Sequence, residues 1–250
     1  MLRIIGERLR QGYRTSGFPA TEPVIPERFR GLPTLKPEKC PPGCTGCSEN
    51  CPFGAVSRED GNITVDLGRC LFCADCPACP HGALNFSNDY RLAVNRRRDL
   101  LFDGRGPALA AALEKKMLSL FKRSLKLRQV SAGGCNGCEA DVNVLGTLVF
   151  DLGRFGIQFV ASPRHADGIL VTGPVTRNMH AALLATYEAV PEPKLVIAAG
   201  ACAINGGPFL DSPEACTGLE SILPVDLYIP GCPPHPYTTL DGLLRLLDKR

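Results

Sequence analysis

Cysteine is the residue type that most constrains how this chain can fold. The sequence of 250 residues contains 13 cysteines, and twelve of them fall into three groups of four. Two groups are compact runs that each end in Cys-Pro, and the third is dispersed through the second half of the chain. The groups are Cys40, Cys44, Cys47 and Cys51; Cys70, Cys73, Cys76 and Cys79; and Cys135, Cys138, Cys202 and Cys232. Thiolates grouped in fours are typical of metal sites, so the fold is expected to bring each set of sulfurs together.

Three kinds of chemistry could use these thiols. Disulfides are disfavoured, because the N-terminal sequence lacks the apolar segment of a secretory signal. Zinc sites with four cysteines usually contain two Cys-x-x-Cys pairs separated by a spacer. Compact four-cysteine runs that end in Cys-Pro are instead typical of ferredoxins with two 4Fe–4S clusters. The sequence therefore favours iron–sulfur clusters, with a zinc-stabilised binding module as the alternative.

In such ferredoxins the fourth cysteine of each run binds the other cluster. This rule predicts one front cluster on Cys40, Cys44, Cys47 and Cys79, and a second on Cys51, Cys70, Cys73 and Cys76. The first run has one residue more than the standard spacing, which the Pro41-Pro42-Gly43 loop can absorb. The second run has one residue fewer before Cys79. The spacing alone leaves open whether both front sites fill.

Apolar periodicity divides the chain into four segments. We expect an extended arm over 1–39 with a short helix at 2–11, a two-cluster ferredoxin domain over 40–100, a linker over 101–124 with a helix from Pro107 to Ser124, and an α/β domain over 125–250. The predicted fold is thus an α+β ferredoxin-like domain followed by an α/β flavodoxin-like domain. Its second part has predicted strands at 126–131, 157–161, 168–172, 194–199 and 225–229, and helices at 138–152, 177–190 and 237–248. All four rear cysteines follow the ends of such strands, where open parallel sheets bind ligands.

Charge and hydropathy restrict the partners. No apolar run is long enough to span a bilayer, so we expect attachment to a membrane only through partner subunits. The net charge is +3, and the basic excess lies in the first half. Arg96-Arg97-Arg98 raises the alternative of nucleic acid or anionic lipid, but a solvated face or a protein interface explains such a run equally well. We predict no nucleic-acid partner.

Five motifs of the second half resemble the small subunits of membrane-bound NiFe hydrogenases, with the formate hydrogenlyase type nearest and complex I as a relative. In order they are Gly134-Cys-Asn-Gly-Cys-Glu139, Ser162-Pro-Arg-His-Ala-Asp167, Thr172-Gly-Pro174, Gly200-Ala-Cys202 and Pro230-Gly-Cys-Pro-Pro234. Residues 20–100, including Pro26-Glu-Arg-Phe-Arg-Gly31, are similar to the two-cluster ferredoxin subunit of the same complexes. The chain therefore resembles two such subunits fused into one. Two residues separate Cys135 from Cys138, whereas the corresponding cysteines are adjacent in complex I, and this favours the hydrogenase branch.

The resemblance implies a third 4Fe–4S cluster on Cys135, Cys138, Cys202 and Cys232. It makes Glu139 a candidate for tuning this cluster or relaying protons, although an acid is also favoured at the start of a helix. It further implies an electron-transfer subunit, without a catalytic residue of its own, that works beside a NiFe-type large subunit and membrane subunits on the cytoplasmic face of the membrane. A complex I-like NADH/quinone module is the alternative within the same class. We expect His165 to bond locally rather than bind metal, and Cys216 to be a small buried residue.

Overall fold

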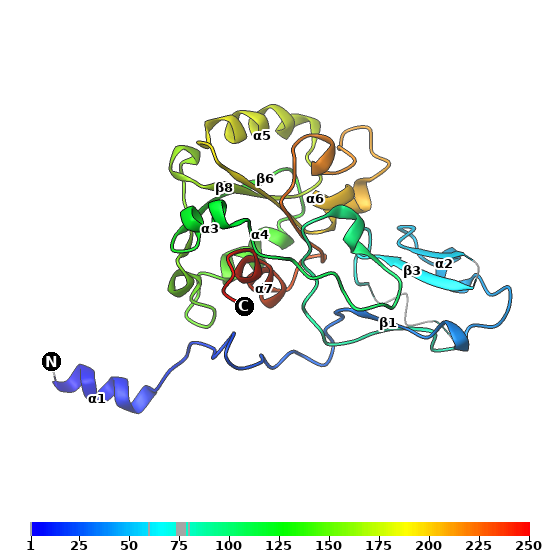
Figure 1. The fold of residues 1–250 in the computed structure, drawn as a ribbon, viewed down its shortest axis with the longest axis horizontal. Helices are drawn as coiled ribbons and strands as arrows, with labels where there is room; N and C mark the ends of the chain where they lie inside the picture. The colour runs from blue at the N-terminus through cyan, green and yellow to red at the C-terminus, as the bar shows by residue number, and fades with distance from the viewer. Residues whose placement is uncertain (1, 60, 74–78, 80) are drawn as a thin grey trace.

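A five-stranded parallel sheet organises the second half of the chain in the computed structural model, which describes residues 2–59, 61–73, 79 and 81–250 (Figure 1). Its strands are β6 (Leu125–Ser131), β7 (Ile157–Phe159), β8 (Gly168–Thr172), β9 (Leu195–Ala199) and β10 (Leu227–Ile229). They lie in the order β10-β9-β8-β6-β7, which is the flavodoxin-type order when the strands are numbered along the chain. The α/β half of the predicted fold is therefore confirmed.

The central strands are buried on both faces, which is why they read as continuous apolar runs. Every residue of β8 and β9 is buried. Ile169 and Val171 join the apolar cluster on one face of the sheet, whereas Leu170 joins the cluster on the other face. This alternation fixes the register of β8, since a shift by one residue would exchange the two sets.

Helices cover both faces of the sheet. Figure 1 shows α5 (Arg177–Ala189) on one side, and α3 (Lys115–Phe121), α4 (Gly137–Val144) and α7 (Pro236–Leu246) on the other. The short helix α6 (Ala201–Asn205) packs on the α5 side through Ile204. Single turns of 3-10 helix lie at Pro37–Lys39, Arg97–Leu100, Leu152–Phe155, Pro163–His165, Gly207–Phe209 and Leu219–Ser221.

The first half of the chain forms two small antiparallel sheets. One pairs β2 (Val56–Glu59), β3 (Asn62–Asp66) and β5 (Leu101–Phe102), and the other pairs β1 (Pro33–Leu35) with β4 (Leu84–Phe86). The short helix α2 (Gly46–Glu49) precedes β2. Ile63 and Val65 of β3 belong to the same apolar cluster as Ile169 and Ile204. The two halves of the chain therefore share one continuous core.

An N-terminal arm runs along the α/β half before it reaches β1. The arm begins after α1 (Leu2–Gln11), which lies at its outer end, away from the rest of the molecule (Figure 1). Phe18 anchors the arm: its ring is 2% exposed and packs against Tyr90 and Tyr237, at centroid distances of 6.0 and 5.3 Å. Arg154 holds the same segment by donating hydrogen bonds to the carbonyls of Ser16 and Phe18, at 2.9 and 2.8 Å.

Two predicted helices are shorter than expected. The helix expected at 138–152 ends at Val144, because Leu145, Phe150 and Leu152 turn inward and are buried. The helix expected from Pro107 to Ser124 spans only Lys115–Phe121. Before it, the amides of Ala110 and Leu113 donate to the carbonyls of Ala93 and Leu246, and not to a preceding helical turn. Tertiary hydrogen bonds thus replace helical ones in this segment. Within the described residues, no helix is long and apolar enough to cross a membrane.

Candidate functional site

The four rear cysteines follow three strands of the parallel sheet. Cys135 and Cys138 lie between β6 and the first turn of α4, Cys202 lies in α6 after β9, and Cys232 follows β10. Parallel strands end at the same edge of a sheet, and β6 borders the point where the strand order reverses. Burial is the main cause that raises the pKa of Cys138, and charge on Cys202, Cys232 and Cys135 adds to it. The structure therefore brings all four predicted rear ligands to one edge of the sheet.

The four rear thiols differ in exposure, and negative charge on one thiol raises the pKa of its neighbours. Cys202 is buried, Cys138 is half-buried, and Cys135 and Cys232 are exposed. Burial raises the pKa of Cys202 to about 11, with further contributions from charge on Cys232 and Cys135. Thiols that disfavour one another's ionisation need a positive partner in order to ionise together, and ligated iron supplies such a partner. The donor set thus fits a four-thiolate iron–sulfur site that opens toward the surface at Cys135 and Cys232.

Two glycines leave room for the sulfurs. Gly200 has φ +93°, and a Cβ at this position would lie 2.6 Å from Sγ of Cys138. Gly207 has φ +53°, and its Cβ would lie 2.9 Å from Sγ of Cys202. Both positions combine a left-handed backbone with a close approach, so any side chain would push against a thiol that is a predicted ligand. The loops are therefore shaped around these two sulfurs.

Glu139 is buried beside Cys138 in the first turn of α4. Its Oε1 accepts a hydrogen bond of 2.5 Å from Oγ1 of Thr172, at the end of β8. Burial opposes ionisation of Glu139, but hydrogen bonds from Thr172 and Ser131 hold its pKa below the ordinary value. Glu139 is thus a carboxylate that ties the ligand-bearing turn to the neighbouring strand. Glu139 also lies in the first turn of the helix. Its position is therefore compatible with a role beside the cluster and with the preference for an acid at the start of a helix.

The first front site gathers three cysteines of the first run and one of the second. Burial is the main cause that raises the pKa of Cys47 to about 12, and a hydrogen bond with Cys79 adds to it. Burial also raises the pKa of Cys40, together with a hydrogen bond to Cys44 and charge on Cys44 and Cys79. Cys79 therefore lies beside Cys47 and within electrostatic reach of Cys40, which is the grouping that an exchange of fourth ligands would require. None of these four cysteines forms a disulfide.

The loop that carries the extra residue of the first run is held by Arg58. The guanidinium of Arg58 donates to the carbonyls of Pro41, at 3.3 Å, and of Cys44. These bonds pin the inserted Pro41-Pro42-Gly43 segment to β2. At the other end of the site, the amides of Ala83, Leu84 and His81 bond to the sulfur of Cys79 and lower its pKa, although burial opposes this shift. Amide donors favour the thiolate form that a cluster requires.

The second front set is described only in part, because Cys76 lies outside the described residues. The amide of Ala55 donates to Sγ of Cys51, and the amide of Phe72 donates to Sγ of Cys70, both at 3.3 Å. Two of the three described sulfurs thus accept a backbone hydrogen bond, which is a common way for proteins to adjust iron–sulfur potentials.

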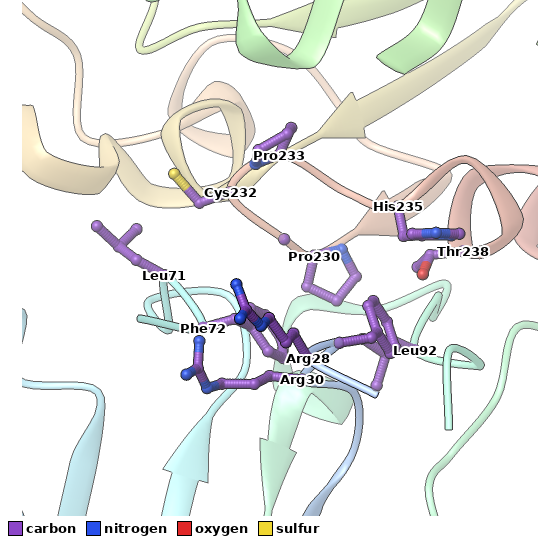
Figure 2. A pocket seen from close by; sticks show the side chains of 12 residues that line it. Arg28, Arg30, Leu71, Phe72, Leu92, Pro230, Cys232, Pro233, His235 and Thr238 are labelled. Carbon is purple, nitrogen blue, oxygen red and sulfur yellow. The ribbon is translucent and has the colours of Figure 1, made fainter. Parts of the chain in front are cut away.

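Cys73 connects the two halves of the chain. Burial raises the pKa of Cys232, and charge on Cys135 and on Cys73 raises it further. A thiol of the second front set therefore lies within electrostatic reach of a rear thiol. A cavity of about 180 Å³ lies next to Cys232, between Leu71 and Phe72 on one side and Pro230 and Pro233 on the other (Figure 2). Sequence reasoning missed this proximity, because no local pattern links residues so far apart.

Single metal ions require closer ligands than clusters do. Over residues 2–59, 61–73, 79 and 81–250, no three His, Cys, Asp or Glu side chains lie close enough to share one ion. The thiolates of a 4Fe–4S cluster bind four different iron atoms, so they stand farther apart than the ligands of one zinc. The fit of the thiols to a cluster rests on the grouping of the sulfurs and on the two glycines described above.

His165 and Cys216, which are not predicted to be ligands, lie apart from these thiol groups. His165 is exposed in a 3-10 turn, where its amide bonds to the carbonyl of Ser162 at 3.1 Å. Cys216 is half-buried and packs against the apolar cluster on the α5 side of the sheet.

Comparisons with known proteins agree with the motifs of the second half. Residues 135–246, which include all four rear cysteines, match the family described as NADH ubiquinone oxidoreductase, 20 Kd subunit. The chain is 44% identical over 140 residues to a probable membrane-bound hydrogenase subunit of Pyrococcus furiosus, covering 55% of this chain and 84% of the relative. It is 45% identical over 143 residues to formate hydrogenlyase subunit 7 of Escherichia coli, covering 56% of each. It is also 50% identical over 112 residues to a subunit of the NADH-quinone oxidoreductase of Citrifermentans bemidjiense, covering 45% of this chain and 65% of the relative.

These relatives are subunits of oxidoreductase complexes of two related kinds. The resemblance drawn from the rear motifs is thereby confirmed. The chain belongs to the family of the NADH ubiquinone oxidoreductase 20 Kd subunit, which includes subunits of membrane-bound hydrogenase, formate hydrogenlyase and NADH-quinone oxidoreductase.

Proposed function

We propose that this chain is an electron-transfer subunit that carries three 4Fe–4S clusters within a multi-subunit, membrane-associated, hydrogenase-like respiratory complex. The observation that carries this proposal is the proximity of Cys73 to Cys232, which joins a front thiol set to the rear one. Electron transfer requires closely spaced centres, and this proximity supports two of the proposed centres lying near each other. The chain has no catalytic residue of its own in this proposal.

The proposed ligand sets follow the grouping of the thiols. Cys40, Cys44, Cys47 and Cys79 would hold the first cluster, Cys51, Cys70, Cys73 and Cys76 the second, and Cys135, Cys138, Cys202 and Cys232 the third. When bound, each cluster supplies a one-electron carrier. Residues 40–100 would form the two-cluster ferredoxin-like domain, between the arm of residues 1–39 and the linker of residues 101–124. Residues 125–250 would hold the third cluster.

The residues of the chain adjust and insulate these centres. Amide donors to the sulfurs of Cys51, Cys70 and Cys79 stabilise negative charge on the ligands. On the inner side of the rear site Cys202 is buried and Cys138 is half-buried, which limits the access of water. Glu139 keeps its negative charge on this inner side of the site, where the carboxylate is available to tune the third cluster or to relay a proton.

The exposed side of the rear site indicates where a partner would bind. Cys135 and Cys232 are exposed, and an uncovered cluster would be open to water and oxygen. We propose that a NiFe hydrogenase-like large subunit covers this edge of the sheet, and that membrane subunits hold the assembly at the cytoplasmic face. The relatives named for membrane-bound hydrogenase and formate hydrogenlyase support this assembly.

A complex I-like module that passes electrons toward a quinone is the second candidate. It is supported by the 50% identity to a subunit of an NADH-quinone oxidoreductase. The separation of Cys135 from Cys138 by two residues favours the hydrogenase-like branch.

Metal and sulfide analysis tests the proposal. We expect anaerobically purified protein to be brown and to contain about twelve iron and about twelve sulfide per chain. About eight of each would show that one front site does not fill, and would point first to the shortened gap before Cys79. A colourless protein that contains zinc and no sulfide would overturn the proposal.

A further inference from the structure

The N-terminal helix α1 presents its side chains to solvent. Each residue from Arg3 to Arg14 is exposed, including Ile4 (74%), Ile5 (53%), Leu9 (80%) and Tyr13 (86%). Figure 1 shows the helix at the outer end of the arm, away from the sheets. Four large apolar side chains within ten residues thus lack an apolar neighbour to cover them, which is unusual for a soluble surface.

The helix is amphipathic and basic. Ile5 and Leu9 are one turn apart and share a face, while Arg3, Glu7 and Arg10 lie on the other side. Arg10 pairs with Glu7 at 3.5 Å, and the guanidinium of Arg8 stacks on the ring of Tyr13 at 4.0 Å. Residues 2–14 contain four arginines and one glutamate. An apolar stripe flanked by arginines, with a tyrosine at its end, suits the boundary between lipid headgroups and acyl chains.

The helix is too short to be stable by itself. Isolated helices below about 12 residues are marginal in water, and α1 has ten residues with Gly6 in its interior. A glycine at such a position costs about 1 kcal/mol relative to alanine. A surface that covers Ile5 and Leu9 would supply the missing stabilisation, so the sequence of α1 matches a helix that forms fully upon contact.

The arm is fixed to the body a few residues after the helix ends, beside exposed apolar side chains. The amide of Ser16 donates to the carbonyl of Val149 at 2.9 Å, and Arg154 holds the carbonyls of Ser16 and Phe18. Val149 and its neighbour Leu148 are themselves exposed, by 45% and 77%. Exposed apolar residues therefore lie at the root of the arm as well as on the helix.

From these observations we propose that residues 2–14 bind the surface of an anionic lipid bilayer, with α1 lying in the plane of the interface and Ile5 and Leu9 facing the acyl chains. The excess of arginine gives charge complementarity to acidic headgroups, and the apolar face distinguishes this partner from nucleic acid, which would need cations alone. This direct contact goes beyond the attachment through partner subunits that the proposed function assumes. It needs none of the clusters.

Tryptophan fluorescence offers a specific probe, because the chain contains no tryptophan. We would place one on the apolar face with Leu9→Trp, and one elsewhere in the arm with Val24→Trp, where the native side chain is 97% exposed. Vesicles of three parts dioleoylphosphatidylcholine to one part dioleoylphosphatidylglycerol should shift the Leu9→Trp emission to the blue. The Val24→Trp emission should not move, and vesicles of phosphatidylcholine alone should bind at least about tenfold more weakly.

Flotation of the full chain with the same anionic vesicles tests the two contributions separately. Ile5→Glu with Leu9→Glu should weaken binding about hundredfold or more, because the buried apolar area is lost. Arg3→Gln and Arg10→Gln should each weaken binding about fivefold, and raising NaCl from about 0.1 M to about 1 M should release the protein. Val24→Glu should bind as the unaltered chain does.

Failure of the unaltered chain to float with anionic vesicles would overturn the proposal. Equal binding to neutral vesicles would also overturn it, as would full binding by the Ile5→Glu, Leu9→Glu variant. Binding only to vesicles that contain membrane subunits of the complex would assign α1 to a protein partner instead. Iron content, measured on the same samples, keeps this result separate from the electron-transfer proposal.

Discussion

Thr172 donates a hydrogen bond of 2.5 Å to Glu139, and both side chains are buried within the sheet–helix junction that carries Cys138. The bond joins the end of β8 to the first turn of α4. Glu139→Ala would leave the hydroxyl of Thr172 without this acceptor and open space beside the ligand turn. We expect a loss of about 1–3 kcal/mol in the free energy of unfolding, measured by chemical denaturation under anaerobic conditions.

Glu139→Gln separates the two roles of this carboxylate. The amide keeps an acceptor for Thr172 but removes the charge, so it should restore most of the stability while altering the reduction potential of the rear cluster. Glu188→Ala, at an exposed position on α5, is the matched control. Unchanged stability and an unchanged potential in both Glu139 variants would show that the contact has neither role.

Gly200 tests the shape of the rear site. Because a Cβ there would lie 2.6 Å from Sγ of Cys138, Gly200→Ala should reduce iron to about eight per chain, through loss of the rear cluster alone. Gly106→Ala adds the same methyl group where no heavy atom lies within 4 Å, and it should keep the full iron content. Equal iron in the two variants would show that the rear cluster does not need the space that Gly200 leaves beside Cys138.

Serine variants of Cys202 and Cys216, two thiols of the rear half, test which of the two is a cluster ligand. Cys202→Ser should abolish or convert only the rear cluster, since its sulfur lies among Cys138, Cys232 and Cys135. Cys216→Ser should leave iron content and the electron paramagnetic resonance spectra of the reduced protein unchanged, because this thiol packs against an apolar cluster. A whole cluster lost from the Cys216 variant would show that the ligand set is wrong.

The attachment of the arm should depend on pH through Glu22. The hydrogen bond from Tyr90, and then that from Arg250, holds the pKa of Glu22 below its ordinary value of 4.5. An acid whose pKa is lower in the folded state stabilises that state above the ordinary pKa and loses this contribution as pH falls through the folded value. The hydrogen-exchange protection factors of residues 17–25, which correct for the slower intrinsic exchange in acid, should therefore fall on acidification below about pH 4.5.

Glu22→Gln mimics the protonated carboxyl at neutral pH, where the clusters are not exposed to acid. It should lower the protection factors of the arm at pH 7 to values near those of the acidified chain. Glu27→Gln, at an exposed acid of the same arm, should leave exchange unchanged. An arm protected equally in both variants would show that Phe18, buried against Tyr90 and Tyr237, holds it without Glu22.

The sequence predicted the strands well because their signal is local. Buried parallel strands are continuous apolar runs, and all five predicted ones are present, as is the helix Leu2–Gln11. Helix ends were predicted less well. The inward turn at Phe150 and the hydrogen bond from Ala110 to Ala93 depend on partners distant in the chain, and an apolar periodicity does not show where such a partner stops a helix.

The packing of the two halves could not be predicted for the same reason. A Cβ at Gly68 would lie 2.8 Å from Ile204, and one at Gly242 would lie 2.6 Å from Ala93. Each contact joins the first half of the chain to the second. The cysteine motifs predicted which thiols belong together, but the proximity of Cys73 to Cys232 follows from this packing alone.

Magnetic coupling between the second front cluster and the rear cluster would show whether two redox centres lie close together at Cys73 and Cys232. The fully reduced chain should show an electron paramagnetic resonance spectrum split or broadened by spin–spin interaction. Cys202→Ser, where it abolishes the rear cluster, should remove the part of that interaction that involves the rear cluster and leave only the spectrum of the two front clusters. A fully reduced chain whose three signals add without any interaction, or a chain with no such signals, would contradict the account.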